Sequence, residues 1–265
     1  CLFFRSRNSK FDMCTVVFLR RPDHRWPLIL AANRDEMASR PWKPPGRHWP
    51  DREEVVAGID ELAGGTWLGM NDDGVVAGVL NRKDSLGPDV RLRSRGELPL
   101  EALDHADAVA AADALSHVDP GAYRSFNLFV ADNRDAYWLS STGPDADGGR
   151  IYEIPEGISM LTAWGLDSDD SARTTYFRPS FEAARAPDPE AGDWSNWEGL
   201  MASRQFATGA TAAEAMYVSG THRAGFGTLS TSLIALETPI ESKPRNVWRF
   251  YRDITQNQAF TEIAL

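Results

Sequence analysis

The chain has 265 residues, 42% hydrophobic and 25% charged, so it is long enough to bury a core of its own. Its formal net charge of −10 opposes a nucleic-acid-binding role, because phosphate binding needs a net-basic face. The two cysteines, Cys1 and Cys14, are too few for a disulfide framework and predict a reducing, cytoplasmic location. No apolar run reaches the roughly 18 residues that a membrane-spanning helix requires.

Near its beginning, the sequence contains a second candidate for the first residue of the protein, Met13. Residues 1–12 do not begin with Met, whereas Met13 is followed by Cys14 and then by a β-rich apolar run. We expect residues 1–12 to be an upstream extension that the mature protein lacks, and residues 13–265 to form a single domain. Removal of Met13 would then leave Cys14 with a free α-amino group.

The first half of the chain predicts strands. Residues 16–19 and 28–32 are apolar runs joined by a Pro-rich, charged turn, which indicates a hairpin. A Pro-rich loop is expected over residues 40–50. Residues 55–81 carry six glycines among β-branched and apolar positions, which predicts a meander of close-packed strands whose last strand ends at Asn81.

The second half alternates helices with strands. The best helix is expected at residues 98–118, where apolar residues recur every three to four positions. A second is expected at residues 171–184, kinked or restarted at Pro179, and a short third at residues 197–204. Further strands are expected at residues 126–130, 137–139, 151–154, 158–162, 227–236 and 247–251. This order favours two sheets with helices outside them.

Basic residues gather in one stretch between the expected strands and the first helix: Arg82, Lys83, Arg91, Arg93 and Arg95. No glycine-rich phosphate-binding loop with Lys and Ser or Thr accompanies them. The stretch is therefore expected to be a solvated loop.

Several motifs together resemble one known family. They are Met13-Cys14-Thr15, Leu30-Ala31-Ala32-Asn33-Arg34-Asp35-Glu36, Arg40-Pro41, Gly64-Gly65-Thr66-Trp67-Leu68-Gly69, Gly74, Asn81, Phe126-Asn127-Leu128 and Gly225-Phe226-Gly227-Thr228. With this set the chain resembles the NRDE family, also called the transport and Golgi organisation family, from Met13 to about Leu236. That family is in turn similar to choloylglycine hydrolase and penicillin V acylase.

The resemblance implies a fold and an activity. The fold is an α+β, four-layer αββα sandwich of two mainly antiparallel sheets, of the N-terminal-nucleophile type. The activity is that of an N-terminal cysteine amidohydrolase acting on non-peptide C–N amide bonds of small acyl compounds, without a cofactor or metal.

Chemistry and resemblance together give four candidate catalytic residues. A terminal Cys14 would supply a thiol nucleophile and an α-amine base with a pKa of about 7.7–8.0. By resemblance, Arg34 would hold the thiolate charge and Asp35 would orient the amine, with a structural Arg34–Asp35 pair as the alternative. Asn81 could donate to the oxyanion or could simply close a turn. Asn127 is expected to be a buried core amide, outside the catalytic set.

Three departures from the family pattern leave turnover open. Met37 stands where the acylase relatives carry an acidic residue, Ala163 stands where the family often has Asn, and Leu229 stands where it commonly has Arg. The alternative is a trafficking protein that keeps the fold without turnover and binds haem, a lipid or an acyl compound. The five histidines show no metal-ligand spacing, and the sequence does not give the oligomeric state.

Overall fold

The structure is a computed structural model. It describes residues 14–85, 87, 89–143, 150–220, 225–239, 244–256 and 260–265. The expected start at Met13 and the extension before it lie outside these residues.

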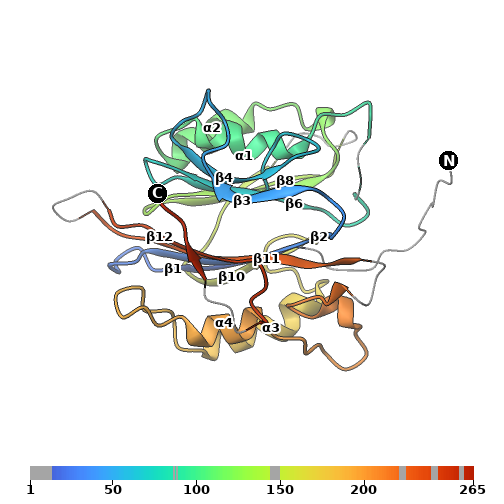
Figure 1. The fold of residues 1–265 in the computed structure, drawn as a ribbon, viewed down its shortest axis with the longest axis vertical. Coiled ribbons are helices and arrows are strands. Elements are labelled where there is room, and N and C mark those ends of the chain that lie inside the picture. Colours follow the sequence, from blue (N-terminus) through green and yellow to red (C-terminus); the bar gives the residue numbers. More distant parts are fainter. Residues whose placement is uncertain are drawn as a thin grey trace.

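Two antiparallel sheets form the centre of the molecule (Figure 1). Sheet A has the strand order β10 (Gly157–Leu161), β1 (Thr15–Arg20), β2 (Leu28–Met37), β11 (Phe226–Leu236), β12 (Val247–Tyr251) and β13 (Thr261–Glu262). Sheet B has the order β3 (Trp42–Gly46), β4 (Val55–Asp60), β5 (Leu68–Asn71), β6 (Val76–Asn81), β7 (Phe126–Ala131), β8 (Ala136–Ser141) and β9 (Arg150–Glu153). The predicted hairpin is confirmed as β1 and β2, whose pairing runs from Thr15 opposite Asn33 to Arg20 opposite Leu28.

Helices cover the outer face of each sheet. Helices α1 (Leu98–Leu103) and α2 (Ala108–Ser116) pack on sheet B, and α3 (Ala172–Ala183) and α4 (Ser195–Met201) pack on sheet A (Figure 1). The predicted four-layer αββα sandwich is therefore confirmed. Among the described residues, no helix combines the length and apolar character that crossing a bilayer requires.

Strand alternation distributes the β1 side chains between two cores. Val16 and Phe18 point between the sheets, whereas Val17 and Leu19 point toward α3 and α4. Cys14 has the same parity as Val16 and packs against the core between the sheets. The nucleophile candidate therefore lies where the first strand of sheet A begins, on the side that faces sheet B.

Two expected elements differ from those observed. The single helix over residues 98–118 is interrupted, because the Asp107 carboxylate accepts a hydrogen bond of 2.7 Å from the Ala110 N–H and so starts α2 as a new helix. The expected loop over residues 40–50 contains strand β3. Because β3 is the edge strand of sheet B, Pro44 and Pro45 can be placed there without removing a hydrogen bond from the sheet interior.

Helix α3 begins one residue later than expected, because Ser171 is its cap: the Ser171 hydroxyl accepts a hydrogen bond of 3.0 Å from the Thr174 N–H. The helix then continues through Pro179 without restarting. This cap places Arg173 in the first turn of α3, against sheet A.

Candidate functional site

All four candidate residues line one cavity of about 270 Å³, here named the Cys14 cavity. Cys14 lies just before β1, Arg34 and Asp35 belong to β2, and Asn81 is the last residue of β6. The cavity therefore lies where the two sheets meet, with sheet A supplying the sulfur and the charged pair and sheet B supplying the amide.

The sulfur of Cys14 contacts the backbone of Asp35. The Asp35 N–H donates to Sγ at 3.3 Å, and Sγ lies 3.5 Å from the Asp35 carbonyl oxygen, which accepts from the thiol. Burial of the thiol, followed by the nearby Asp35 charge, raises the pKa of Cys14 to about 12, although the Asp35 N–H and Arg34 act in the opposite direction. With Met13 still attached, the thiol is therefore neutral at physiological pH.

The Arg34 guanidinium reaches from sheet A to aromatic rings of sheet B. Its central carbon lies 4.1 Å from the Trp67 ring centroid and 5.6 Å from that of Trp42, and the two indoles meet edge to face. In the part of the chain that the structure describes, Nη1 of Arg34 is buried without a hydrogen-bond partner. Burial lowers the pKa of Arg34, whereas the neighbouring Cys14 raises it. The aromatic rings thus hold a cation beside the sulfur.

The position of Trp67 depends on Gly58 in the neighbouring strand β4. A methyl group added at Gly58 would lie 2.3 Å from the Trp67 ring. We expect Gly58→Ala to reduce the free energy of unfolding by about 1–3 kcal/mol, because the indole must move. Urea denaturation measures this change. Gly199→Ala in α4 is the control, since nothing lies within 4 Å of its added methyl group. Equal stability of the two variants would show that Trp67 is not held against Gly58.

Asp35 points to the opposite face of sheet A from Cys14 and Arg34. Its carboxylate pairs at 3.2 Å with Nη1 of Arg173 and accepts a hydrogen bond of 2.6 Å from the Thr228 hydroxyl. The side chains of Asp35 and Arg173 are both completely buried. Arg173 also donates to the Thr15 hydroxyl at 2.6 Å and to the Ala213 carbonyl at 3.1 Å. It therefore ties the residue after Cys14 to α3.

Leu229, one of the three departures from the family pattern, lies at a β-bulge. Thr228 pairs with Asp35 and Ser230 pairs with Arg34, so Leu229 is the extra residue in β11. The bulge lets Thr228 contact Asp35 on the outer face while Ser230 turns inward, where it borders a small recess beside Cys14. An arginine is absent from this position, and the cation on this side of the sheet comes from Arg173.

Two asparagine side chains of sheet B, those of Asn81 and Asn127, have different surroundings. Asn81 lines the Cys14 cavity, and among the described residues its side chain has no hydrogen-bond partner. The fully buried Asn127 accepts from Nη1 of Arg82 at 2.8 Å and from the Trp138 indole at 3.2 Å, and it donates to the Thr162 carbonyl at 2.7 Å. The prediction that Asn127 is a core amide is confirmed.

The expectation of a wholly solvated basic loop was wrong for two of its residues. Arg82 is partly buried against Asn127 and also donates to the Ser140 hydroxyl at 2.7 Å. Arg95 lines the Cys14 cavity and donates to the Ser85 hydroxyl at 2.8 Å and the Ser125 carbonyl at 2.9 Å. Neutral acceptors near these positions, which the sequence does not reveal, draw both guanidiniums inward.

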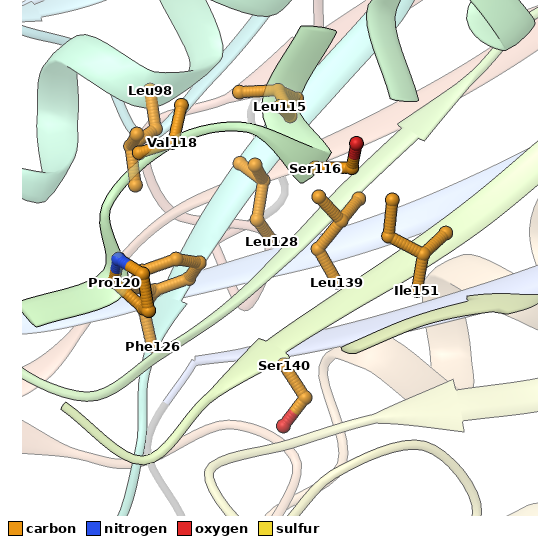
Figure 2. A pocket seen from close by; sticks show the side chains of 10 residues that line it. All are labelled: Leu98, Leu115, Ser116, Val118, Pro120, Phe126, Leu128, Leu139, Ser140 and Ile151. Carbon is orange, nitrogen blue, oxygen red and sulfur yellow. The ribbon is translucent and has the colours of Figure 1, made fainter. Parts of the chain in front are cut away.

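A second cavity, on the other side of sheet B, is too small for a substrate. Figure 2 shows a small apolar cavity between the helices and sheet B, with Leu115, Leu128 and Leu139 directed into it. Its volume of about 10 Å³ leaves room for one water molecule at most. Within the described ranges, no group of three or more His, Cys, Asp or Glu side chains is arranged to hold a metal ion.

Comparison with known proteins agrees with this fold. Residues 13–194 match the family model described as Transport and Golgi organisation 2. The chain is 36% identical over 134 residues to the human Transport and Golgi organization protein 2 homolog and 34% identical over 133 residues to the mouse homolog. Each match covers 45% of this chain and 45% of the relative, so the chain spans about half the length of these curated relatives.

The fold also occurs in a solved amidase structure. The Caenorhabditis elegans N-acylethanolamine-hydrolyzing acid amidase ortholog superposes with a TM-score of 0.51 at 11% identity. The match covers 83% of this chain and 92% of that protein, and at this identity it establishes the shared fold. Since the family model matches most of its length, the chain belongs to the Transport and Golgi organisation 2 family.

Proposed function

We propose that the chain acts, after cleavage before Cys14, as an N-terminal cysteine amidohydrolase on non-peptide C–N amide bonds of small acyl compounds. The observation that carries this proposal is the Cys14 cavity, which brings the sulfur, the Arg34 cation and the Asn81 amide to one opening. The hydrolysis named for the worm amidase belongs to the same reaction class, and it supports the proposal through the shared fold.

Cleavage is required because an amide nitrogen is not a base. While Met13 remains attached, no group on Cys14 can accept the thiol proton, and the thiol pKa is raised to about 12. A free α-amine, with a pKa of about 7.7–8.0, can take that proton near neutral pH. As an ammonium it also places a positive charge next to the thiolate, which lowers the thiol pKa.

The reaction then follows in two halves. The amine removes the thiol proton, and the thiolate attacks the substrate carbonyl carbon to form a C–S bond. The oxyanion accepts a hydrogen bond from the Asn81 amide. Collapse breaks the C–N bond, and the ammonium gives its proton to the leaving amine. Water activated by the same amine hydrolyses the thioester and releases the acid.

The charged groups of sheet A divide the supporting work. Arg34 lies on the sulfur side of the sheet and stabilises the thiolate. Asp35 lies on the other side, where its pairing with Arg173 holds the start of β1 and keeps Cys14 in register. Orientation of the new amine by Asp35 is part of the proposal.

The test is a panel of acyl amides incubated with the chain processed at Cys14 and analysed by intact mass. We expect an acyl adduct on Cys14, no adduct with Cys14→Ala, and a rate about 10²–10³ lower with Asn81→Ala, which removes an oxyanion donor. Asn133→Ala is the matched control, because Asn133 lies beyond the opposite end of β7, where it donates to the Glu237 carbonyl.

The alternative reading predicts a different result in the same experiment. A haem, lipid or acyl carrier without turnover would bind its ligand but leave Cys14 unmodified. Persistent absence of an adduct across the panel, with ligand bound by both the processed chain and Cys14→Ala, would contradict the hydrolase proposal.

A further inference from the structure

On the wall of the Cys14 cavity, the acidic residues have partners of opposite charge, whereas several arginines have none within the part of the chain that the structure describes. Each acidic residue that lines the cavity has an arginine within 4 Å of its carboxylate: Glu36 with Arg40 at 3.7 Å, Asp60 with Arg40 at 2.6 Å, Asp89 with Arg91 at 2.9 Å, and Asp35, whose carboxylate points to the other face of sheet A, with Arg173 at 3.2 Å. Each of these carboxylates therefore has a cation of the protein beside it, and Glu36 and Asp60 share Arg40.

Three arginines on the same wall have no such counter-ion. Among the described residues, Arg34, Arg95 and Arg124 have no carboxylate within 4 Å, whereas Arg40 and Arg93 do. Arg95 is held by the Ser85 hydroxyl and the Ser125 carbonyl, and Arg124 by the Gly87 carbonyl at 3.4 Å. These neutral acceptors contact the guanidiniums without pairing with their charge, and the carboxylates of Asp89 and Glu36 act on Arg124 and Arg95 only from beyond 4 Å.

Glycines bring Arg95 to this wall. Arg95 begins a short 3₁₀ helix, Arg95–Glu97, and the Thr66 N–H donates to the Gly96 carbonyl at 2.8 Å. A methyl group at Gly65 would lie 2.4 Å from the Gly96 carbonyl carbon, so only glycine lets the two backbones touch. The segment Gly64-Gly65-Thr66-Trp67 thus positions both Arg95 and Arg34. Gly65 lets the Arg95 segment pack closely, and Trp67 supplies the aromatic ring that contacts Arg34.

Of these three arginines, Arg95 and Arg124 repel each other, and neither has a carboxylate of the described residues in direct contact, which is unfavourable without a ligand. Burial, and next the charge of Arg124, lowers the pKa of Arg95 to about 10. An anion bound between them would relieve both effects, and the planar guanidinium fork suits carboxylate and phosphate oxygens. The whole chain carries a net charge of −10, so this positive site is a local feature.

We propose that the substrate of this site carries an oxyanion, a carboxylate or a phosphate, that binds Arg95 and Arg124 while its amide carbonyl lies at Cys14. This inference deepens the proposed function and rests on it, because only a protein that hydrolyses amides has the bound compound as a substrate. The apolar recess next to Cys14 measures about 20 Å³, which is room for little more than a methyl group. In this proposal a short acyl group lies toward this recess, and the anion lies on the other side of the amide bond.

The test compares two ligands that differ only in charge. N-acetylglycine and its neutral isostere N-acetylglycinamide are titrated calorimetrically into the full chain carrying Cys14→Ala, so that binding is measured without turnover. We expect the carboxylate to bind at least tenfold more tightly, with a preference that falls as salt is raised. A parallel competition with inorganic phosphate shows which oxyanion the site prefers.

Variants then show which residues cause the preference for the carboxylate ligand. With Arg95→Gln added, we expect the two ligands to bind within about twofold of each other, since charge-assisted pairing is lost. Arg47→Gln removes an equal charge from an exposed arginine paired with Asp72, and it should keep the preference. If thermal melting shows that Arg95→Gln does not fold, Arg124→Gln replaces it, with the same expected loss.

In the binding measurements, three results would overturn the inference: equal binding of the two ligands, equal weakening of both by Arg95→Gln, or no binding of either at millimolar concentration. Because these measurements use Cys14→Ala, they are independent of catalysis. An anion preference in a protein that hydrolyses nothing would refute the proposed function alone. Hydrolysis of neutral and anionic amides at equal efficiency would refute this inference alone.

Discussion

Replacing Arg173 with Met is expected to lower the free energy of unfolding by about 3–5 kcal/mol, the range for breaking a buried ion pair from one side. The variant leaves Asp35 as a buried carboxylate without its cation, and the Thr15 hydroxyl and Ala213 carbonyl also lose a donor. Chemical denaturation measures the loss. In protein that remains folded, the acyl-adduct rate should also fall, because Thr15 adjoins Cys14.

A double-mutant cycle separates the ion pair from the rest of the loss. Asp35→Asn removes the charge that Arg173 neutralises, so the double variant should be less destabilised than the sum of the single variants, by about 0.5–3 kcal/mol. Arg178→Met on the same helix is the control, because Arg178 is partly exposed and pairs on the surface with Asp167 and Glu182. Its effect should stay within about 0.5 kcal/mol. Additive single losses would show that Asp35 and Arg173 are not energetically coupled.

The parts of the site that the sequence predicts are those set by strand periodicity. Cys14 and Arg34 face the same core because β1 and β2 pair directly and side chains alternate along each strand. Asn81 reaches the cavity because β6 ends there. The same alternation places the Asp35 side chain on the opposite face of sheet A. This consequence is missing from the interpretation of Arg34 and Asp35 as a structural pair.

Residues brought in by long-range packing could not be predicted in the same way. Arg173 is separated from Asp35 by 138 residues, and the pattern of α3 does not show which side chain meets the sheet. One signal was available: a carboxylate in a buried strand requires a cation, and Arg173 follows a capping serine. Arg95 depends on the contact between Gly65 and Gly96, which only the folded backbone reveals.

Cleavage before Cys14 is expected to raise the alkylation rate of that thiol by at least about 10²-fold at pH 8. In the uncleaved chain, a pKa of about 12 leaves roughly one thiol in 10⁴ ionised at pH 8, compared with about a quarter of ordinary cysteines. The rate should therefore climb tenfold with each pH unit up to about pH 11. After cleavage, the new α-ammonium favours the thiolate, and the profile should level off at lower pH. Iodoacetamide labelling, quantified on the Cys14 peptide so that Cys1 does not contribute, gives both profiles.

Arg34 provides the matched comparison within the cleaved chain. Its guanidinium is the cation that lowers the thiol pKa from the sulfur side of the sheet, so Arg34→Gln should shift the alkylation profile to higher pH. Arg47→Gln removes the same charge from a surface pair with Asp72 and should leave the profile unchanged. Superimposable profiles before and after cleavage would mean that burial still governs the sulfur once the amine is free. The amine would then have no acid–base role, and the proposed chemistry would lose its general base.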